Sequence, residues 1–240
     1  GQFTDATAKA GLESRTSGTT LALGDVDRDG DLDLYVANFG ELALLRDGGS
    51  FAVRQVGGKS VVTGQYASRL KIVDGKLIEL GESDAFYLND GLGVFQRVPW
   101  GSGRFVHADG QPLAEPLDFG LCVQMRDING DGFVDIYVCN DFQTPDRFWL
   151  NDGAGKFREA GPEAVRSVAY ASMGADFADI DRDGHTDFFV VEMLSRDAST
   201  RLMNSSPNNP LPPLPGGLGK RLQVARNTTH VPYTHLRPHQ

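Results

Sequence analysis

Three short phrases rich in aspartate have residue types and spacing suited to binding a hard cation. Residues 25–33 read DVDRDGDLD, residues 127–135 read DINGDGFVD, and residues 179–187 read DIDRDGHTD; we call them loops 1, 2 and 3. Each has Asp or Asn at positions 1, 3 and 5, Gly at position 6 and Asp at position 9. Calcium takes about six to eight oxygen ligands in an adaptable shell, so this alternation predicts a calcium site in each loop, about three in all.

The side chains at positions 1, 3, 5 and 9 are the predicted ligands, joined by the backbone carbonyl at position 7. Glycine at position 6 permits a turn with positive φ, which a Cβ atom would oppose. The side chain at position 7 is free to vary because only its carbonyl is used. The predicted side-chain ligands are Asp25, Asp27, Asp29, Asp33, Asp127, Asn129, Asp131, Asp135, Asp179, Asp181, Asp183 and Asp187; the backbone ligands are Asp31, Phe133 and His185; and the turn glycines are Gly30, Gly132 and Gly184.

An EF-hand and a metal-free turn both fit the loops less well. An EF-hand needs a glutamate at position 12, but Val36, Val138 and Val190 stand there, each inside an apolar, strand-like run. Metal-free acidic turns remain an alternative, since Asp, Asn and Gly favour turns for backbone reasons alone; three copies of one pattern argue against it. Magnesium prefers fewer protein ligands, and zinc prefers His or Cys. Loop 2 is expected to bind calcium most weakly, because Asn129 replaces one carboxylate.

The positions of the loops indicate a repeat of about 50 residues. Loop 3 begins 52 residues after loop 2, and loop 2 begins 102 residues after loop 1, or two periods of 51. A degenerate copy is therefore expected near Asp74, within IVDGK, and the phrases FYLNDGLGVF and FWLNDGAGKF add paired hairpin turns. Repeats of this length with short strands are typical of propeller blades. We predict an all-β fold: a partial β-propeller of about four four-stranded blades, with the calcium loops between the first two strands.

The same landmarks divide the chain. The phrase FTDA at residue 3 resembles FREA at residue 157, so the chain is expected to open with the last strand of a preceding blade. Pro/Gly-rich composition marks a loop at 207–219, and the stretch after it continues no earlier pattern. The predicted units are the strand and connection at 1–18, blades with calcium loops at 19–56, 117–160 and 168–206, a degenerate blade at 57–100, an inserted rim loop at 101–116, and a Pro-rich loop with an irregular tail at 207–240.

Composition argues against two classes of partner. The 240 residues carry 23 Lys and Arg against 32 Asp and Glu, a formal net charge of −9. Nucleic acid and anionic membrane are therefore not expected partners, because phosphate binding needs clustered cations. No apolar run reaches the length of a membrane span. The chain has no signal peptide but begins at Gly1 instead of Met, which leaves room for an upstream segment.

Two cysteines, Cys122 and Cys139, flank loop 2 at similar distances. A hairpin at loop 2 would place them opposite each other. Two buried thiols are the favoured interpretation, because few hairpin pairs meet the geometry of a disulfide. A cross-strand disulfide, which would indicate an oxidising compartment, is the alternative.

The repeated phrases resemble the FG-GAP/VCBS repeat superfamily, and more closely its cartilage-acidic-protein-like (ASPIC/UnbV-associated) group. The matching phrases include FTDATAKAGL, LALGDVDRDGDLDLYVAN, RDINGDGFVDIYVCNDF, DRFWLNDGAGKF and GADFADIDRDGHTDFFVVEML, which cover most of residues 1–195. The resemblance implies a calcium-stabilised propeller, often seven-bladed as in integrin heads, and an extracellular, periplasmic or cell-surface location. It departs at residues 72–76 and after about residue 200. Seven such units would need roughly 350 residues, so further blades are expected outside this chain.

Three functions remain open at this stage. The first is a non-catalytic module that binds a protein or glycan, with structural calcium and contacts on one rim, because loops vary freely on a rigid scaffold. Its candidate contacts in the insertion are Trp100, Arg104, Phe105 and His107, although ordinary loop packing explains them more simply. The second is a propeller-based lyase or hydrolase with a site outside the Asp loops; no nucleophile or metalloprotease motif supports it. The third is an adhesion subunit whose calcium bridges a partner carboxylate.

Overall fold

The computed structural model describes residues 1–40, 51–73, 75–141, 144–161, 172–192 and 233–235. Within them the chain is all-β, with short 3-10 turns and no α-helix, so no described helix is long and apolar enough to cross a membrane. Three larger sheets carry most of the strands, and two separate hairpins complete the fold.

The first sheet has the order β1-β2-β7-β8, and all of its neighbours are antiparallel. The second has the order β10-β11-β12-β13 with β9 added in parallel at its edge, and the third has the order β14-β15-β16. The strands are β1 (Gly18–Gly24), β2 (Asp33–Asn38), β7 (Ala85–Asn89), β8 (Phe95–Arg97), β9 (Phe105–Val106), β10 (Gly120–Arg126), β11 (Asp135–Asn140), β12 (Arg147–Asn151), β13 (Phe157–Glu159), β14 (Ser172–Ala178), β15 (Asp187–Glu192) and β16 (Tyr233–His235).

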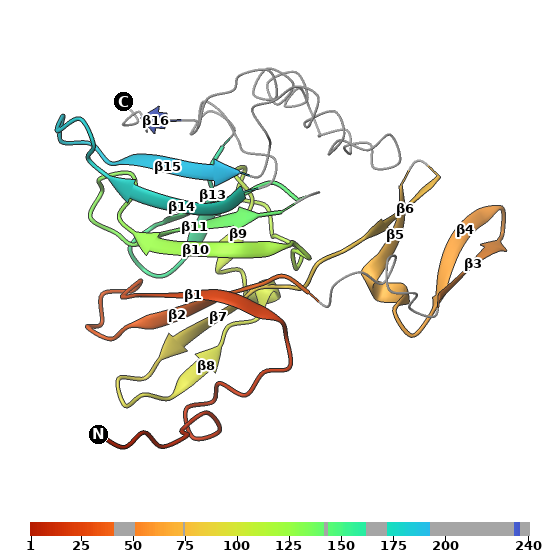
Figure 1. Cartoon of the computed structure of the whole chain (residues 1–240), viewed down its shortest axis with the longest axis horizontal. Coiled ribbons are helices and arrows are strands. Elements are labelled where there is room, and N and C mark those ends of the chain that lie inside the picture. Colours follow the sequence, from red (N-terminus) through yellow and green to blue (C-terminus); the bar gives the residue numbers. More distant parts are fainter. Residues whose placement is uncertain (41–50, 74, 142–143, 162–171, 193–232, 236–240) are drawn as a thin grey trace.

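The three sheets lie side by side as blades of a partial propeller, which confirms the predicted fold class (Figure 1). The first strand of each blade contacts that of the next, β1 against β10 and β10 against β14. The sequence therefore identified the first two strands of every blade correctly, together with the loop that joins them. The hairpin predicted from FWLNDGAGKF is also present, as β12 and β13.

Two apolar cores form between the blades, and β11, the second strand of the middle blade, is buried on both faces and contributes to both. In β11, Ile136 and Val138 face the first blade, whereas Tyr137 and Cys139 face the third. The core between blades 1 and 2 is rich in aromatic rings and contains Val26, Tyr35, Ala37, Phe86, Trp100, Phe105, Leu113, Val123, Ile136, Val138, Trp149 and Phe157. The core between blades 2 and 3 contains Ile128, Tyr137, Cys139, Phe148, Phe177, Phe188 and Val190.

The expected degenerate blade at 57–100 is wrong, and so is the boundary of the blade at 19–56. Strands β7 and β8 complete the first blade, because β7 pairs directly with β2. The residues between β2 and β7 include two hairpins, β3–β4 and β5–β6, which project from the blades at the right of Figure 1. Their elements are β3 (Phe51–Val56), β4 (Lys59–Gly64), η1 (Ala67–Arg69), β5 (Leu70–Val73) and β6 (Lys76–Glu79). The decayed loop expected at Asp74 falls on the turn between β5 and β6, and Asp74 itself lies outside the described residues.

Three more boundaries differ from expectation. Residues 1–17 form no strand, and Phe3 is fully exposed; the segment instead packs on the first blade, where Phe95 donates its amide to Ala10 O. The insertion at 101–116 is not a free rim loop, since it supplies β9 to the edge of the second blade. Within the tail at 207–240, β16 pairs antiparallel with β15, and the rest of that tail lies outside the described residues.

Candidate metal centres

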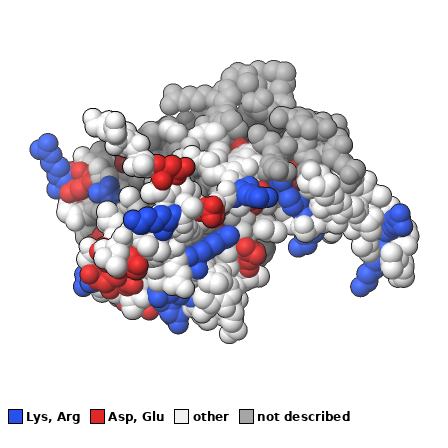
Figure 2. All heavy atoms as spheres, turned by 90° about the horizontal axis from the view of Figure 1, so that it is seen from below, with Lys and Arg blue, Asp and Glu red and all other residues white. Residues whose placement is uncertain are grey.

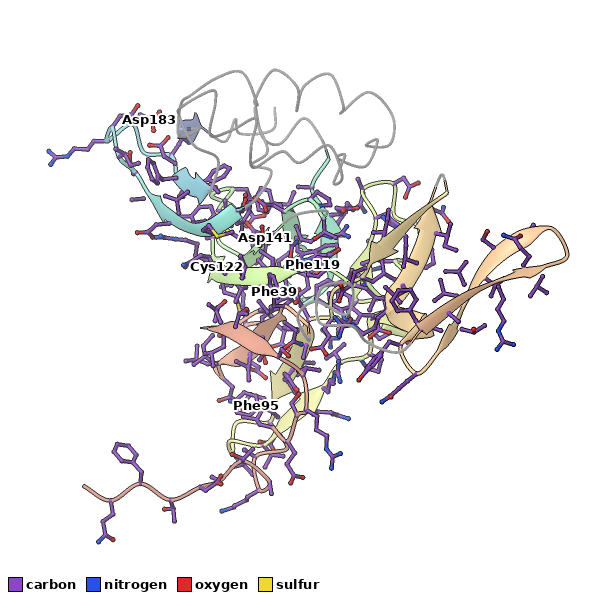
Figure 3. All side chains as sticks on the ribbon, turned by 45° about the vertical axis from the view of Figure 1, so that its right-hand side comes forward. Phe39, Phe95, Phe119, Cys122, Asp141 and Asp183 are labelled. Carbon is purple, nitrogen blue, oxygen red and sulfur yellow. The ribbon has the colours of Figure 1, made fainter. Side chains whose placement is uncertain are left out.

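Each Asp loop joins the first two strands of its blade, and the three loops lie along one edge of the molecule, at the left of Figure 1. Loops 1 and 2 touch directly. Arg28 Nη2 donates a hydrogen bond to Gly132 O at 2.7 Å, and its guanidinium lies 4.3 Å from the centroid of the Phe133 ring. Figure 3 shows Asp183 of loop 3 at the outer tip of its loop.

The three loops share one backbone course. The position 6 glycines have φ values of 94°, 84° and 87°, which confirms the predicted left-handed turn. Position 4 is left-handed as well, at Arg28, Gly130 and Arg182, and the sequence pattern did not predict this. A non-glycine residue rarely adopts positive φ unless its surroundings hold it there. The amide of each turn glycine donates to the position 1 carboxylate: Gly30 to Asp25 at 3.2 Å, Gly132 to Asp127 at 2.8 Å and Gly184 to Asp179 at 3.0 Å.

Loop 1 gathers carboxylate oxygens as a cation site requires. Asp25, Asp27 and Asp29 each offer an oxygen, and these oxygens lie within 4.8 Å of one another. Among the described atoms, Asp25 Oδ1 and Asp27 Oδ1 are buried and have no hydrogen-bond donor. Because a buried acceptor without a donor is costly, these oxygens fit a bound cation well. Calcium suits the all-oxygen donor set.

Loop 3 gathers Asp179, Asp181 and Asp187 within the same 4.8 Å. Loop 2 is organised differently, although all nine of its residues are described. Its Asn129 Nδ2 donates to Asp131 Oδ2 at 2.9 Å. Both oxygens of Asp127 accept backbone amides, as both oxygens of Asp179 do in loop 3. Three carboxylate oxygens do not converge to 4.8 Å in loop 2 as they do in the other two loops.

The position 9 carboxylates have a second role, because they join the loop to the third strand of the blade. Asp33 accepts the amide of Val26 at 3.1 Å and that of Asn89, in β7, at 3.0 Å. Asp135 repeats the arrangement with Ile128 at 3.1 Å and with Asn151, in β12, at 2.9 Å. Both carboxyl groups are buried.

Burial raises the pKa of the position 9 carboxyl groups, because it disfavours the ionised form. The pKa of Asp33 lies above its ordinary value, and that of Asp135 is raised to about 7. Neighbouring acids add to the effect, Asp27 and Asp29 for Asp33 and Asp131 for Asp135, whereas the backbone donors oppose it. A divalent cation in the loop would favour the ionised form and lower both pKa values.

The side chains at position 7 of loops 1 and 2 lie against the Asn-Asp-Gly turns of their own blades, in keeping with a ligand role for their carbonyls alone. Asp31 lies against Gly91, and Phe133 lies against Gly153. A Cβ atom on Gly153 would come within 2.3 Å of the Phe133 ring, so this glycine makes room for the position 7 side chain. The Asn-Asp-Gly turns therefore support the Asp loops from the neighbouring hairpin.

Of the residues expected to contact a partner on the rim, two are core residues. Trp100 and Phe105 are buried, with ring centroids 4.5 Å apart, because the insertion folds onto the first core. Arg104 donates to Gly155 O at 2.9 Å, beside the Asn-Asp-Gly turn of blade 2. His107 is about half exposed and contacts Glu159 at 3.1 Å. Of these four residues, only Arg104 and His107 remain available to a partner.

A buried polar triad that recurs in the first two blades was not predicted from the sequence. Tyr35 donates its hydroxyl to Asp84 at 2.8 Å, and the same carboxylate accepts the Asn38 amide at 2.8 Å. In blade 2 the corresponding residues are Tyr137, Asp146 and Asn140, at 2.6 and 2.9 Å. The sequence does contain a signal for the triad, because an Asp opens both related phrases, DAFYLNDG and DRFWLNDG. Burial raises the pKa of Asp84 to about 7.

A separate cluster of charges lies beside the second blade. Arg147 contacts Asp118 at 2.7 Å and Glu159 at 2.9 Å. Burial disfavours the cation, but the two carboxylates hold the pKa of Arg147 above its ordinary value. Arg147 is paired with both carboxylates, which suits a structural role. On the face shown in Figure 2, acidic and basic side chains are interspersed, without a large basic field.

Comparison with known proteins agrees with this geometry. A family described as an FG-GAP-like repeat matches residues 127–190, from the first residue of loop 2 to β15. Cartilage acidic protein 1 of Mus musculus is 27% identical over 218 residues, which is 81% of this chain and 32% of that protein. Cartilage acidic protein 1 of Homo sapiens is 27% identical over 212 residues, 79% of this chain and 31% of that protein. The chain thus spans about a third of the length of these curated relatives. It carries an FG-GAP-like repeat across its second and third blades and resembles cartilage acidic protein 1 over most of its length.

Proposed function

We propose that this chain is a calcium-binding propeller module in which the ion is structural and the exposed surface binds a protein or a glycan. The observation that carries the proposal is the convergence of carboxylate oxygens in loops 1 and 3. The two buried oxygens of loop 1 that lack a donor support it further. Bound calcium would neutralise the clustered carboxylates between the first two strands of each blade.

Calcium binding is tested by calorimetric titration and by thermal unfolding in calcium, magnesium or EDTA. Calcium at about a hundredfold excess over Kd should stabilise the fold by about 2.7 kcal/mol per site, which for a domain of this size is roughly 5–10 °C in Tm. Asp27→Asn should reduce the effect. Asp109→Asn is the matched control, since Asp109 is an exposed turn residue outside the loops. Equal Tm values in calcium and EDTA, with no heat of binding, would disprove the proposal.

A non-catalytic role is part of the same proposal. One described group of titratable side chains outside the loops surrounds Arg147, and its two carboxylates pair with that cation. A lyase or hydrolase would instead need an acid and a base facing a substrate. Glycan-array binding in calcium and in EDTA, alongside product release from polysaccharide substrates, separates the two functions. Turnover that survives calcium-loop substitutions would favour the enzyme.

We further infer that additional blades cover the two outer faces of this chain, and that the protein acts in an extracellular or periplasmic compartment or at a cell surface. Val123 is buried between blades 1 and 2, but its counterpart in the first blade, Leu21, is 62% exposed. Likewise, Tyr137 is buried between blades 2 and 3, but its counterpart Phe189 is 40% exposed. The similarity to cartilage acidic protein 1 supports the location. Fractionation of cells expressing the longer protein tests it.

A further inference from the structure

The two cysteines are direct cross-strand neighbours in the second blade. Cys122 of β10 is the register partner of Cys139 of β11, as the sequence suggested. Opposed residues in an antiparallel pair have Cα atoms about 4.5 or 5.5 Å apart, and both distances lie within the range of about 4.4–6.8 Å that a disulfide spans. As direct register partners, the two side chains lie next to each other on the same face of the sheet.

The two thiols differ in their surroundings. Cys139 is fully buried in the core between blades 2 and 3, whereas Cys122 is only partly buried. Figure 3 shows Cys122 on β10, on the side of the third blade. The hydrogen bond from Cys139 lowers the pKa of Cys122 to about 6, and the same bond raises the pKa of Cys139 above its ordinary value. Cys122 is thus the more accessible and the more readily ionised of the two.

Among the three blades, only the second carries this pair. The equivalent register partners are Thr20 and Ala37 in the first blade and Gly174 and Val191 in the third. The chain between the two cysteines contains all of loop 2, the loop with an asparagine in place of a carboxylate. A bond there would close the β10–β11 hairpin around the loop with the fewest carboxylates.

We propose that Cys122 and Cys139 form a redox pair that closes into a cross-strand disulfide across the base of loop 2. The oxidant is a small-molecule disulfide such as oxidised glutathione. The Cys122 thiolate attacks one sulfur of that disulfide, the S–S bond breaks, and one glutathione thiolate leaves. Cys139 then loses its proton to solvent and attacks the Cys122 sulfur, which releases the second glutathione. Two protein thiols are oxidised and one glutathione disulfide is reduced to two thiols.

The test is to incubate the folded, full chain with oxidised glutathione and to measure thiol content, intact mass and cysteine-linked peptides. The wild type should lose both thiols and two hydrogens, with one peptide pair joining Cys122 to Cys139 and no covalent dimer. Cys139→Ser should stop at a stable glutathione adduct on Cys122, and Cys122→Ser should react far more slowly. The oxidised wild type should also melt roughly 5 °C or more above the reduced form, because the bond restricts the unfolded chain.

Two results would overturn the proposal. One is a wild-type protein that keeps a glutathione adduct on Cys122 without closing the internal bond. The other is a folded protein whose two thiols stay unreacted while the urea-unfolded chain reacts freely. Both results are read from the wild type alone, so the inference stays testable if either serine variant fails to fold.

Discussion

Replacing Asp135 with asparagine tests its proposed role as a calcium ligand separately from its role as a hydrogen-bond acceptor. The carboxyl group is buried, and it accepts backbone amides from Ile128 and Asn151. Burial raises its pKa to about 7, some three units above the value in an unfolded chain, which corresponds to at most about 4 kcal/mol for the fully ionised group. Asparagine removes that cost but offers one acceptor oxygen instead of two, at a cost of about 1–3 kcal/mol.

These opposing effects predict that Asp135→Asn changes the free energy of unfolding little without metal and more when calcium is bound. In EDTA at pH 7.5, the free energy of unfolding of Asp135→Asn should lie within about 2 kcal/mol of the wild type. At calcium about a hundredfold above the wild-type Kd of loop 2, which is expected to be the weakest of the three sites, the variant should lose a further 2.7 kcal/mol or so, the stabilisation that one occupied site would supply. The assay is urea unfolding of both proteins in calcium and in EDTA.

Asp84→Asn is the matched control. Asp84 is also buried, its pKa is also raised to about 7, and it also accepts a backbone amide, but it lies outside the loops. Its substitution should change the free energy of unfolding equally in calcium and in EDTA. If Asp135→Asn also gives the same change in both conditions, Asp135 is not a metal ligand, and the link between its burial and calcium binding is wrong.

Three further predictions concern the packing and the buried charges. Folding raises the pKa of Asp84, so the stability that its carboxyl group contributes is fully present below about pH 4 and is lost as the pH rises through about 7. Compared with Asp84→Asn, the wild type should lose up to about 4 kcal/mol of unfolding free energy across that pH range, as measured by urea unfolding. Gly153→Ala should destabilise the fold by about 1–3 kcal/mol more than Gly93→Ala, because both residues have positive φ but only the first would clash with the Phe133 ring. Arg147→Met should lower the unfolding free energy by about 3–5 kcal/mol, because it removes the guanidinium that pairs with the buried Asp118 and with Glu159. Thermal unfolding measures this, in a variant whose far-UV circular dichroism spectrum matches that of the wild type.

The Asp loops and the strands beside them could be predicted because their signal is local. Alternating acids, a glycine at position 6 and an apolar run afterwards are all contained within about 15 residues, and the turn geometry at Gly30 and its counterparts follows from that pattern alone. The pairing of Cys122 with Cys139 was also predictable, since a hairpin around loop 2 fixes the register within one residue.

The organisation of the first blade could not be predicted, because it depends on pairing between distant segments. In blade 2 the hydrogen bond from the third strand to the position 9 carboxylate joins residues 16 apart, Asp135 and Asn151. In blade 1 the same bond joins Asp33 and Asn89, which are 56 apart. The longer separation in blade 1 includes two inserted hairpins. This insertion makes the distance between loops 1 and 2 about twice the repeat length. Spacing alone does not distinguish an extra blade from an insertion of the same length.

The bonds of the position 9 carboxylates also indicate what bound calcium would do for the fold. Asp33 and Asp135 join loops 1 and 2 to the third strand of their blades by accepting backbone amides. We therefore expect the order of the strands to be the same with and without the ion. What remains without protein partners in loop 1 is a pair of buried oxygens, Asp25 Oδ1 and Asp27 Oδ1. Calcium should therefore raise stability and order the loop edge without changing the sheets. The far-UV circular dichroism spectrum at 20 °C or so should be the same in EDTA and in calcium, while Tm differs; loss of the β spectrum in EDTA would instead mean that the ion is needed to form the blades.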